Sequence, residues 1–289
     1  MSSPTLADSL TPLSRDAGCV FAEQEAHLIA HHARTPAHAA DLAERRAAGT
    51  PLEHVLGWAR LRGVTVRVDP GVFLPRPRSA LLADLAVGLL PERGVAVDLC
   101  CGSGILAAIL IAARPHARVH AVDLDPNAVA CARRNLPAHR VHHGDLCAAL
   151  PPRLRGRVDV LVANVPHVPT DRLRLLPAEA RLYEAPLALD GGPDGLDVLR
   201  RLARQAPGRL APTGTVLVET AAHQAGTARK VLADAGLRPE VRTAPTATPP
   251  SSRPPPGDPR PRPASSSVRA GEPVRAPATR PASSRVSYG

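Results

Sequence analysis

The stretch that decides the fold runs from Val95 to Gly104 and has the sequence V-A-V-D-L-C-C-G-S-G. Its first residues are small or β-branched and apolar, which is typical of a short buried strand. Gly102 and Gly104 follow, and glycine lets a backbone turn sharply and approach a ligand closely. An apolar helical run begins directly afterwards. A strand, a glycine turn and a helix N-terminus form the ligand-binding crevice of open α/β sheets, so we predict an α/β fold that binds a cofactor.

The spacing of this turn indicates which cofactor. Dinucleotide-binding turns have the pattern G-x-G-x-x-G, and the residues L-C-C-G-S-G after Asp98 do not match it. A carboxylate just before the turn is better suited to S-adenosylmethionine (AdoMet), because it can hold the cationic amino group of the methionine part, often through water. We therefore predict that Asp98, Cys100, Gly102 and Gly104 bind AdoMet.

A second acidic residue supports the same cofactor. The stretch H-A-V-D, residues 120–123, ends the next predicted strand, and Asp123 lies about 20 residues beyond Gly104. A carboxylate at this distance can accept hydrogen bonds from both ribose hydroxyls. A helix-capping role for Asp123 is the alternative, but Asp125 followed by Pro126 already supplies that cap.

The rest of the core alternates between strand and helix patterns, as a parallel sheet requires. Strands are predicted at 94–99, 118–123, 139–142, 158–163, 214–220 and 237–243, and helices at 80–90, 104–113, 126–136, 195–206 and 222–236. Gly144, Asp145 and Leu146 follow the third strand. Asp145 is predicted to accept the adenine amino group and Leu146 to pack on the ring, although a plain surface turn fits this tripeptide equally well.

The tetrapeptide N-V-P-H, residues 164–167, follows the fourth strand at the sheet edge where ligands bind. Asn164 can accept a hydrogen bond from a planar NH2 group, and the Val165 carbonyl is free to accept a second. Pro166 stiffens the turn, and His167 offers a flat face for stacking. Two acceptors aimed at these hydrogens would help to direct the nitrogen lone pair at a methyl donor, so catalysis would rest on positioning and electrostatics. An ordinary turn is the alternative interpretation.

The chain before this core has its own pattern. Residues 1–50 are predicted to form a small helical domain, in which an apolar stripe precedes a second helix that begins at Thr35-Pro36 and ends at Gly49. The stripe consists of Cys19, Val20, Phe21, Ala26, Leu28 and Ile29. Residues 51–79 are predicted to form a β-hairpin, within 56–68, and a linker. Residues 80–243 would then be the methyltransferase domain.

Composition limits the function classes. The 289 residues carry a net charge of +10, of which residues 240–289 contribute eight arginines against three acids. The remainder is only mildly basic and Lys230 is the only lysine, so the arginine excess indicates coding bias, and a nucleic-acid partner is disfavoured without being excluded. Five cysteines without a C-x-x-C pair favour a reducing cytoplasm and argue against a metal framework. No signal peptide or membrane span is expected, and we predict a monomer.

Five stretches together resemble the PrmC/HemK family of protein-(glutamine-N5) methyltransferases, over roughly residues 40–243. They are G-T-P-L-E-H-V-L-G-W (49–58), V-D-P-G-V-F-L-P-R-P-R-S (68–79), V-D-L-C-C-G-S-G (97–104), N-V-P-H (164–167) and Y-E-A-P-L-A-L-D-G-G-P-D-G-L-D (183–197). The last is the most distinctive, because generic methyltransferases lack it. The resemblance implies a seven-stranded class I methyltransferase fold behind a helical N-terminal domain. It also implies that the substrate is a glutamine side-chain amide, in the family that of a Gly-Gly-Gln loop in a peptide release factor.

This sequence departs from the family pattern at several positions. Cys100 replaces the first glycine, which a side chain tolerates if φ stays negative. Arg78-Ser79 replaces Glu-Thr, Val165 replaces a proline, and His167 replaces a tyrosine and adds a group that titrates near neutrality. These departures indicate a divergent branch of the family.

The C-terminus departs most. Residues 245–289 hold 12 of the 33 prolines and almost no large apolar side chains, so 244–289 is predicted to be disordered and the seventh strand to be missing. A basic tether and a shifted reading frame would each account for this composition.

Two other functions remain open at this point. Amino-methyltransferases of RNA or DNA bases also use Asn-Pro-Pro-aromatic motifs, and an inactive AdoMet-binding protein would follow if Cys100, His167 and the lost strand abolish turnover. The segment 183–197 favours a protein glutamine substrate over a base, as does the small number of aromatic residues, two Phe, two Tyr and one Trp.

Overall fold

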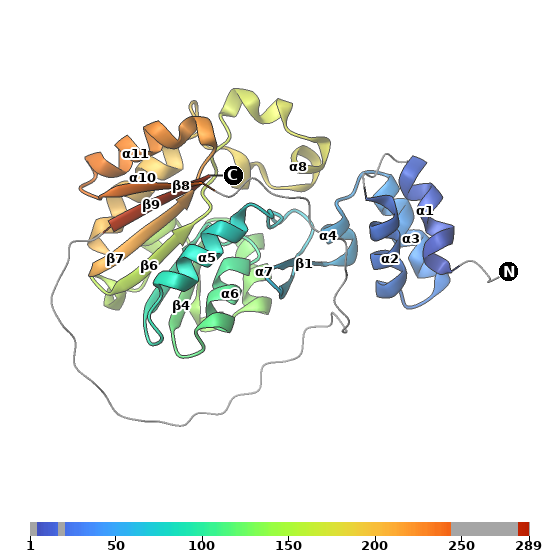
Figure 1. Cartoon of the computed structure of the whole chain (residues 1–289), viewed down its shortest axis with the longest axis horizontal. Helices are drawn as coiled ribbons and strands as arrows, with labels where there is room; N and C mark the ends of the chain where they lie inside the picture. Colours follow the sequence, from blue (N-terminus) through green and yellow to red (C-terminus); the bar gives the residue numbers. More distant parts are fainter. Residues whose placement is uncertain (1–4, 17–20, 244–282, 289) are drawn as a thin grey trace.

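The computed structural model describes residues 5–16, 21–243 and 283–288 of the chain. Four helices come first, followed by a two-stranded hairpin and then by a seven-stranded sheet with helices on both faces (Figure 1). In the described residues, no helix combines the length and the apolar character needed to cross a membrane.

The sheet has the strand order β5-β4-β3-β6-β7-β9-β8, and every neighbouring pair is parallel. Its strands are β3 (Val95–Leu99), β4 (Arg118–Asp123), β5 (Val141–His143), β6 (Val158–Ala163), β7 (Leu210–Glu219), β8 (Pro239–Thr243) and β9 (Ser283–Tyr288). The parallel arrangement places the carboxyl ends of β3, β4 and β6 together at one edge. The α/β class predicted from the sequence is confirmed.

The two faces of the sheet follow the period of two expected for strands. Ala96 of β3 packs with α5 (Ser79–Leu89), α6 (Ile105–Ala113) and α7 (Pro126–Asn135). Val95, Val97 and Leu99 point to the other face, toward α10 (Asp197–Gln205) and α11 (Ala225–Asp234). Both faces of β3 are therefore buried, which explains why its sequence is apolar without alternation.

The predicted loss of the seventh strand is wrong. Residues 283–288 form β9, which lies between β7 and β8 and pairs with both. Residues 244–282 lie outside the described residues, so the predicted disorder of the tail is contradicted only for 283–288. The composition of the tail did not indicate this strand. The segment has only six residues, which give little strand pattern, and it is far in the sequence from the strands with which it pairs.

The N-terminal residues form three helices before residue 50, where the sequence pattern indicated two. They are α1 (Leu6–Asp16), α2 (Ala22–His32) and α3 (Pro36–Ala47). The cap of α3 is as predicted, since Thr35 Oγ1 accepts the His38 backbone N–H at 3.1 Å. Apolar contacts join these helices to α4 (Leu52–Leu56), which was not predicted.

The apolar stripe predicted for this region is only partly correct. Ala26 and Ile29 are fully buried, whereas Phe21 is 58% exposed and Leu28 is 42% exposed. The buried positions of α2 are 22, 26 and 29, a spacing that leaves Phe21 and Leu28 on other faces of the helix. Cys19 and Val20 lie outside the described residues.

The hairpin and the linker lie where the sequence predicted them. β1 (Trp58–Leu61) pairs antiparallel with β2 (Val64–Arg67), and residues 68–78 then lead into α5. The third strand of the core is shorter than predicted, because a turn of 3-10 helix at Ala138–Arg140 occupies its first residues and Pro137 starts that turn. The domain boundaries at residues 50, 79 and 243 stay predictions.

Candidate active site

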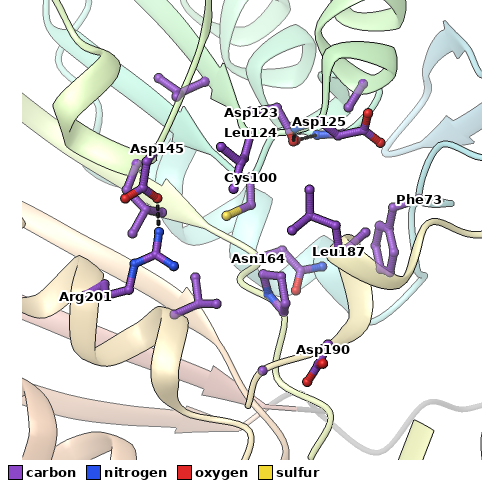
Figure 2. A pocket seen from close by; sticks show the side chains of 18 of the residues that line it. Phe73, Cys100, Asp123, Leu124, Asp125, Asp145, Asn164, Leu187, Asp190 and Arg201 are labelled. Carbon is purple, nitrogen blue, oxygen red and sulfur yellow. Dashed lines mark hydrogen bonds and ion pairs between the residues drawn. The ribbon is translucent and has the colours of Figure 1, made fainter. Parts of the chain in front are cut away.

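A cavity of about 430 Å³ opens at the carboxyl ends of β3, β4 and β6 (Figure 2). Among the predicted site residues, seven line it: Cys100, Gly102, Asp123, Asp145, Leu146, Asn164 and Pro166. Residues of the segment between β6 and α10 form its other side. Stretches that are separated by up to 128 positions in the sequence, from Phe73 to Arg201, thus meet at one sheet edge, as the topology requires.

The turn after β3 forms one wall of the cavity. Its backbone is left-handed at Gly102, with φ +54°, and at Gly104, with φ +80°. Gly104 itself does not line the cavity, because it packs against α7, where an added Cβ would lie 2.7 Å from Leu136 Cδ1. Its predicted role in cofactor binding is therefore that of shaping the turn.

Cys100 adopts the same left-handed conformation, with φ +56°. The condition under which a side chain was expected to be tolerated here, a negative φ, is therefore not met. The side chain lies among the labelled residues of the cavity in Figure 2. A residue with a Cβ is strained in the left-handed region, so Cys100 adopts a backbone conformation that glycine usually occupies.

Asp123 holds the turn and faces the cavity at the same time. Its Oδ2 accepts the Gly102 N–H at 2.8 Å, and its Oδ1 accepts the Asp125 N–H at 2.9 Å. Burial raises the pKa of this carboxyl group above its usual value, while the two backbone donors act against that rise. Each oxygen has a further lone pair, so the carboxylate can still accept hydrogen bonds from a ligand.

Asn164 lies where the cavity meets the start of α5. Its Nδ2 donates to Ser79 Oγ at 3.4 Å, and Ser79 is only 3% exposed. With its amino group directed to Ser79, the side chain presents its Oδ1 as an acceptor. Ser79 was singled out in the sequence as the residue that keeps a hydroxyl in the linker, and the structure shows what that hydroxyl contacts.

The Val165 carbonyl is not free, which corrects the prediction. His167 Nδ1 lies 2.9 Å from this oxygen, so the ring is held by its own turn. Burial lowers the pKa of His167 below its usual value, and the hydrogen bond to Val165 acts in the opposite sense. The carbonyl retains one lone pair for a substrate, and the hydrogen bond fixes the plane of the His167 ring, whose predicted stacking stays a prediction.

Comparison with known proteins places this site in a family. A family model described as the methyltransferase small domain matches residues 63–192. The release factor glutamine methyltransferase of Streptomyces coelicolor is 38% identical over 217 residues, which cover 71% of this chain and 77% of that protein. The protein of the same name from Corynebacterium glutamicum is 36% identical over 238 residues, which cover 74% and 83%. The chain belongs to the release factor glutamine methyltransferase family.

Membership confirms the resemblance drawn from the sequence motifs and makes the chain an AdoMet-dependent class I methyltransferase. Among solved structures, the release factor-specific protein-(glutamine-N5) methyltransferase of Alicyclobacillus acidocaldarius is 26% identical. That match covers 56% of this chain and 78% of the other, with a TM-score of 0.34.

The cavity fits the cofactor of this family. Its volume of about 430 Å³ lies within the usual range for a small-molecule site. Asp123 supplies acceptors for hydroxyl groups, and Leu124 and Leu187, which are 41% and 49% exposed, supply apolar contact area for a purine (Figure 2). The polar and apolar groups that a nucleoside needs are thus present around the same cavity.

Asp98 lies behind the cavity wall and not in it. It is 1% exposed, and its Oδ2 accepts the Ala107 N–H of α6 at 3.0 Å. Its Oδ1 is buried without a hydrogen-bond partner in the described residues, and burial raises its pKa to about 8. The side chain supports the first turn of α6, and its predicted contact with the methionine amino group stays a prediction.

Asp145 has a partner that sequence analysis missed. It forms an ion pair with Arg201 of α10, and both side chains line the cavity (Figure 2). Leu146 follows with φ +46° and is 4% exposed. An adenine amino group would therefore approach a carboxylate that is already neutralised in part by a guanidinium. Two other residues that line the cavity, Phe73 and Leu187, lie in stretches that resemble the family. No sequence pattern indicated that Arg201 pairs with Asp145.

A second cavity, of about 310 Å³, adjoins the first. Phe73, Asn164 and Ala188 line both, whereas Val165 and His167 line only the second. Its outer wall includes Arg78, whose Nε donates to the buried Glu219 Oε1 at 2.7 Å. The cation that replaces the family's carboxylate at position 78 is thus paired within this chain.

Gln224 connects the tetrapeptide to the segment around residue 194. Its Nε2 donates to the His167 carbonyl at 2.9 Å and to the Asp194 carbonyl at 3.1 Å. The side chain is 4% exposed, so these bonds are shielded from water. Gln224 is a positioning residue that the sequence patterns did not reveal, because it lies at the start of α11, far from either segment in the chain.

Proposed function

We propose that this chain transfers a methyl group from AdoMet to the side-chain amide nitrogen of a glutamine in a peptide release factor. The observation that carries the proposal is the position of Asn164, which lines both cavities. A cofactor in the first cavity and a side chain in the second would meet at this residue. The named activity of relatives that are 36–38% identical over most of their length supports the same substrate.

The residues at this junction suit an amide nitrogen. The Asn164 Oδ1 would accept one hydrogen of the amide, and the remaining lone pair of the Val165 carbonyl would accept the other. Together they would fix the plane of the NH2 group and orient the nitrogen toward the first cavity. The cofactor supplies an electrophilic methyl group.

Positioning carries most of the catalysis in this proposal. The nitrogen lone pair of an amide is delocalised, and two acceptors on its hydrogens favour the geometry in which that pair becomes available. Such contacts strengthen as the nitrogen pyramidalises, so they stabilise the transition state more than the ground state. His167 would hold the Val165 carbonyl in place, and its lowered pKa keeps the ring neutral at pH 7.

The second cavity fits an extended glutamine side chain better than a flat nucleobase. It is lined by the apolar residues Val168, Leu176 and Leu189 as well as by the polar junction. A nucleobase site would be expected to offer aromatic stacking surfaces. Among the described residues that line this cavity, the aromatic rings are those of Phe73 and His167, and the Arg76 guanidinium already lies 5.0 Å from the centroid of the Phe73 ring. This difference favours the protein substrate over the base amino-methyltransferase alternative.

The test is transfer of tritium-labelled methyl groups to a purified release factor. We expect label on the wild-type factor and none on a factor whose Gly-Gly-Gln glutamine is replaced by alanine. Asn164→Ala should reduce the labelling rate, whereas Asn127→Ala, at the exposed start of α7, should not. Equal labelling of both release factors would overturn the proposal.

The same proposal includes a cytoplasmic location and a monomeric enzyme, because the residues of both cavities come from one chain. Sedimentation of the purified chain at micromolar concentration should give the mass of a single copy, 30.3 kDa.

A further inference from the structure

A third cavity lies at the opposite end of the sheet from the active site. Its volume is about 220 Å³, and it is lined by Val95, Arg118, His120, His139, Arg140, Arg153, Leu154 and Arg157. Val95 and Arg118 are the first residues of β3 and β4, and Arg157 directly precedes β6. Because β3 has five residues, the two ends of the sheet are separated by about 13 Å, and this cavity is distinct from the methyltransferase site.

The charge of this cavity has one sign. Four arginines line it, and none of its lining residues that the structure describes is acidic. In the described part of the chain, these four guanidinium groups have no ion pair. Asp159, at the start of β6, instead uses its Oδ2 to accept the Val95 N–H at 2.8 Å and does not line the cavity.

Ten of the arginines that the structure describes form an ion pair and the others do not, so the four arginines of this cavity differ from the rest in being grouped around one hollow. Arg46, Arg76, Arg78, Arg200 and Arg201 each form an ion pair. Coding bias explains a high arginine content, but it does not explain why four cations line one hollow that has no acidic residue among its described lining residues. Like charges that face one another are unfavourable, so a bound anion would relieve the repulsion.

Histidines also contribute to this cavity. His120 is 5% exposed and lines the cavity, and its Nδ1 lies 3.0 Å from His142 Nε2. The two rings are stacked, with centroids 5.3 Å apart. Burial, followed by the surrounding cations, lowers the pKa of His120 to about 4, so the ring is neutral at pH 7 and can still donate a hydrogen bond. One hollow is thus lined by a buried histidine and four arginines, which distinguishes it from a flat basic surface.

We propose that this cavity binds a small anion with two or more linked phosphate groups. Guanidinium groups match phosphate oxygens in pairs, which makes arginine suited to phosphate recognition. A single phosphate carries a charge of about −1.5 to −2, which leaves four arginines only half neutralised. A volume of about 220 Å³ equals that of about seven water molecules, which is enough for a diphosphate and too little for a folded polyanion.

The experiment is calorimetric titration of the full chain with inorganic pyrophosphate in phosphate-free buffer at low salt. We expect one site per chain, and we expect Arg118→Ala and Arg153→Ala each to raise the dissociation constant about 10-fold, because each removes a charge-assisted contact. Arg155→Ala is the matched control. It removes the same charge from the same loop, but Arg155 does not line the cavity, so the dissociation constant should change less than about 3-fold.

Two further measurements test whether each variant is folded and whether the cavity binds RNA instead of a small anion. Thermal unfolding of each variant without pyrophosphate shows that it is folded, and an exposed arginine should be removable without loss of the fold. A single-stranded oligouridylate RNA tests a nucleic-acid partner in the same buffer. Absence of pyrophosphate binding, an equal loss in Arg155→Ala, or tighter RNA binding that pyrophosphate competes with would each overturn the proposal.

Discussion

Replacing Cys100 with glycine tests the strained turn directly. Cys100 has φ +56°, and a left-handed backbone costs a residue with a Cβ about 1–2 kcal/mol. Glycine removes that cost but also loosens the unfolded chain, which lowers stability by about 0.4–1 kcal/mol. From the middle of these ranges, the free energy of unfolding should rise by about 0.8 kcal/mol. For a protein of this size, the melting temperature would rise by about 2 °C.

The matched control is Cys101→Gly. Cys101 is 7% exposed and is not among the positive-φ residues, so glycine there brings no relief and removes a buried side chain. We expect this variant to lose at least about 1 kcal/mol. Thermal unfolding by circular dichroism gives both values, and AdoMet titration of Cys100→Gly shows whether the thiol limits the cofactor site. If Cys100→Gly is destabilised as much as Cys101→Gly, the backbone at residue 100 is not strained.

The other predictions concern the site and its ionisation. Asn164→Ala should lower kcat about 10²–10³-fold in methyl transfer to a release factor and leave the AdoMet dissociation constant unchanged, and an unchanged kcat would place the amide elsewhere. Asp123→Ala should weaken AdoMet binding by about 2–4 kcal/mol in calorimetry, and unchanged affinity would remove Asp123 from the site. Asp98 has its pKa raised to about 8 by burial, above its unfolded value of 3.8, so the folded state holds the extra proton and stability falls as pH rises through this window. Asp98→Asn should flatten the melting temperature between pH 5 and pH 9, and an identical pH profile in both proteins would contradict the assignment.

Much of the active site could be predicted from local sequence. Asp123, Leu146 and Asn164 were predicted because each follows a strand, and residues that follow parallel strands meet at one edge. The turn after β3 was predicted because its two glycines stand between an apolar strand and an apolar helix. In these cases the signal lies within about ten residues, which is the range over which backbone preference acts.

Single side-chain contacts within that site could not be predicted in the same way. The Val165 carbonyl was expected to be free, and the ring two residues later occupies one of its lone pairs. A side chain at residue 100 was expected to be tolerated if φ stays negative, and Cys100 has φ +56° instead. Both differences arise because a pattern of residue types specifies which groups are near but not which lone pair or dihedral angle is used.

The sequence by itself determined the parallel sheet, the cofactor edge and the family, because each depends on short motifs in a fixed order. Only the tertiary structure decided that β9 lies between β7 and β8, that Arg201 pairs with Asp145, and that four arginines from three parts of the chain line one hollow. The strand pairs of β9 and the Asp145–Arg201 ion pair join residues that are 45 to 68 positions apart, and the four arginines span 39 positions, so each arrangement depends on how packed elements bring residues together. Local backbone preference does not predict contacts over such separations, because their free energy comes from burial and charge in the folded chain.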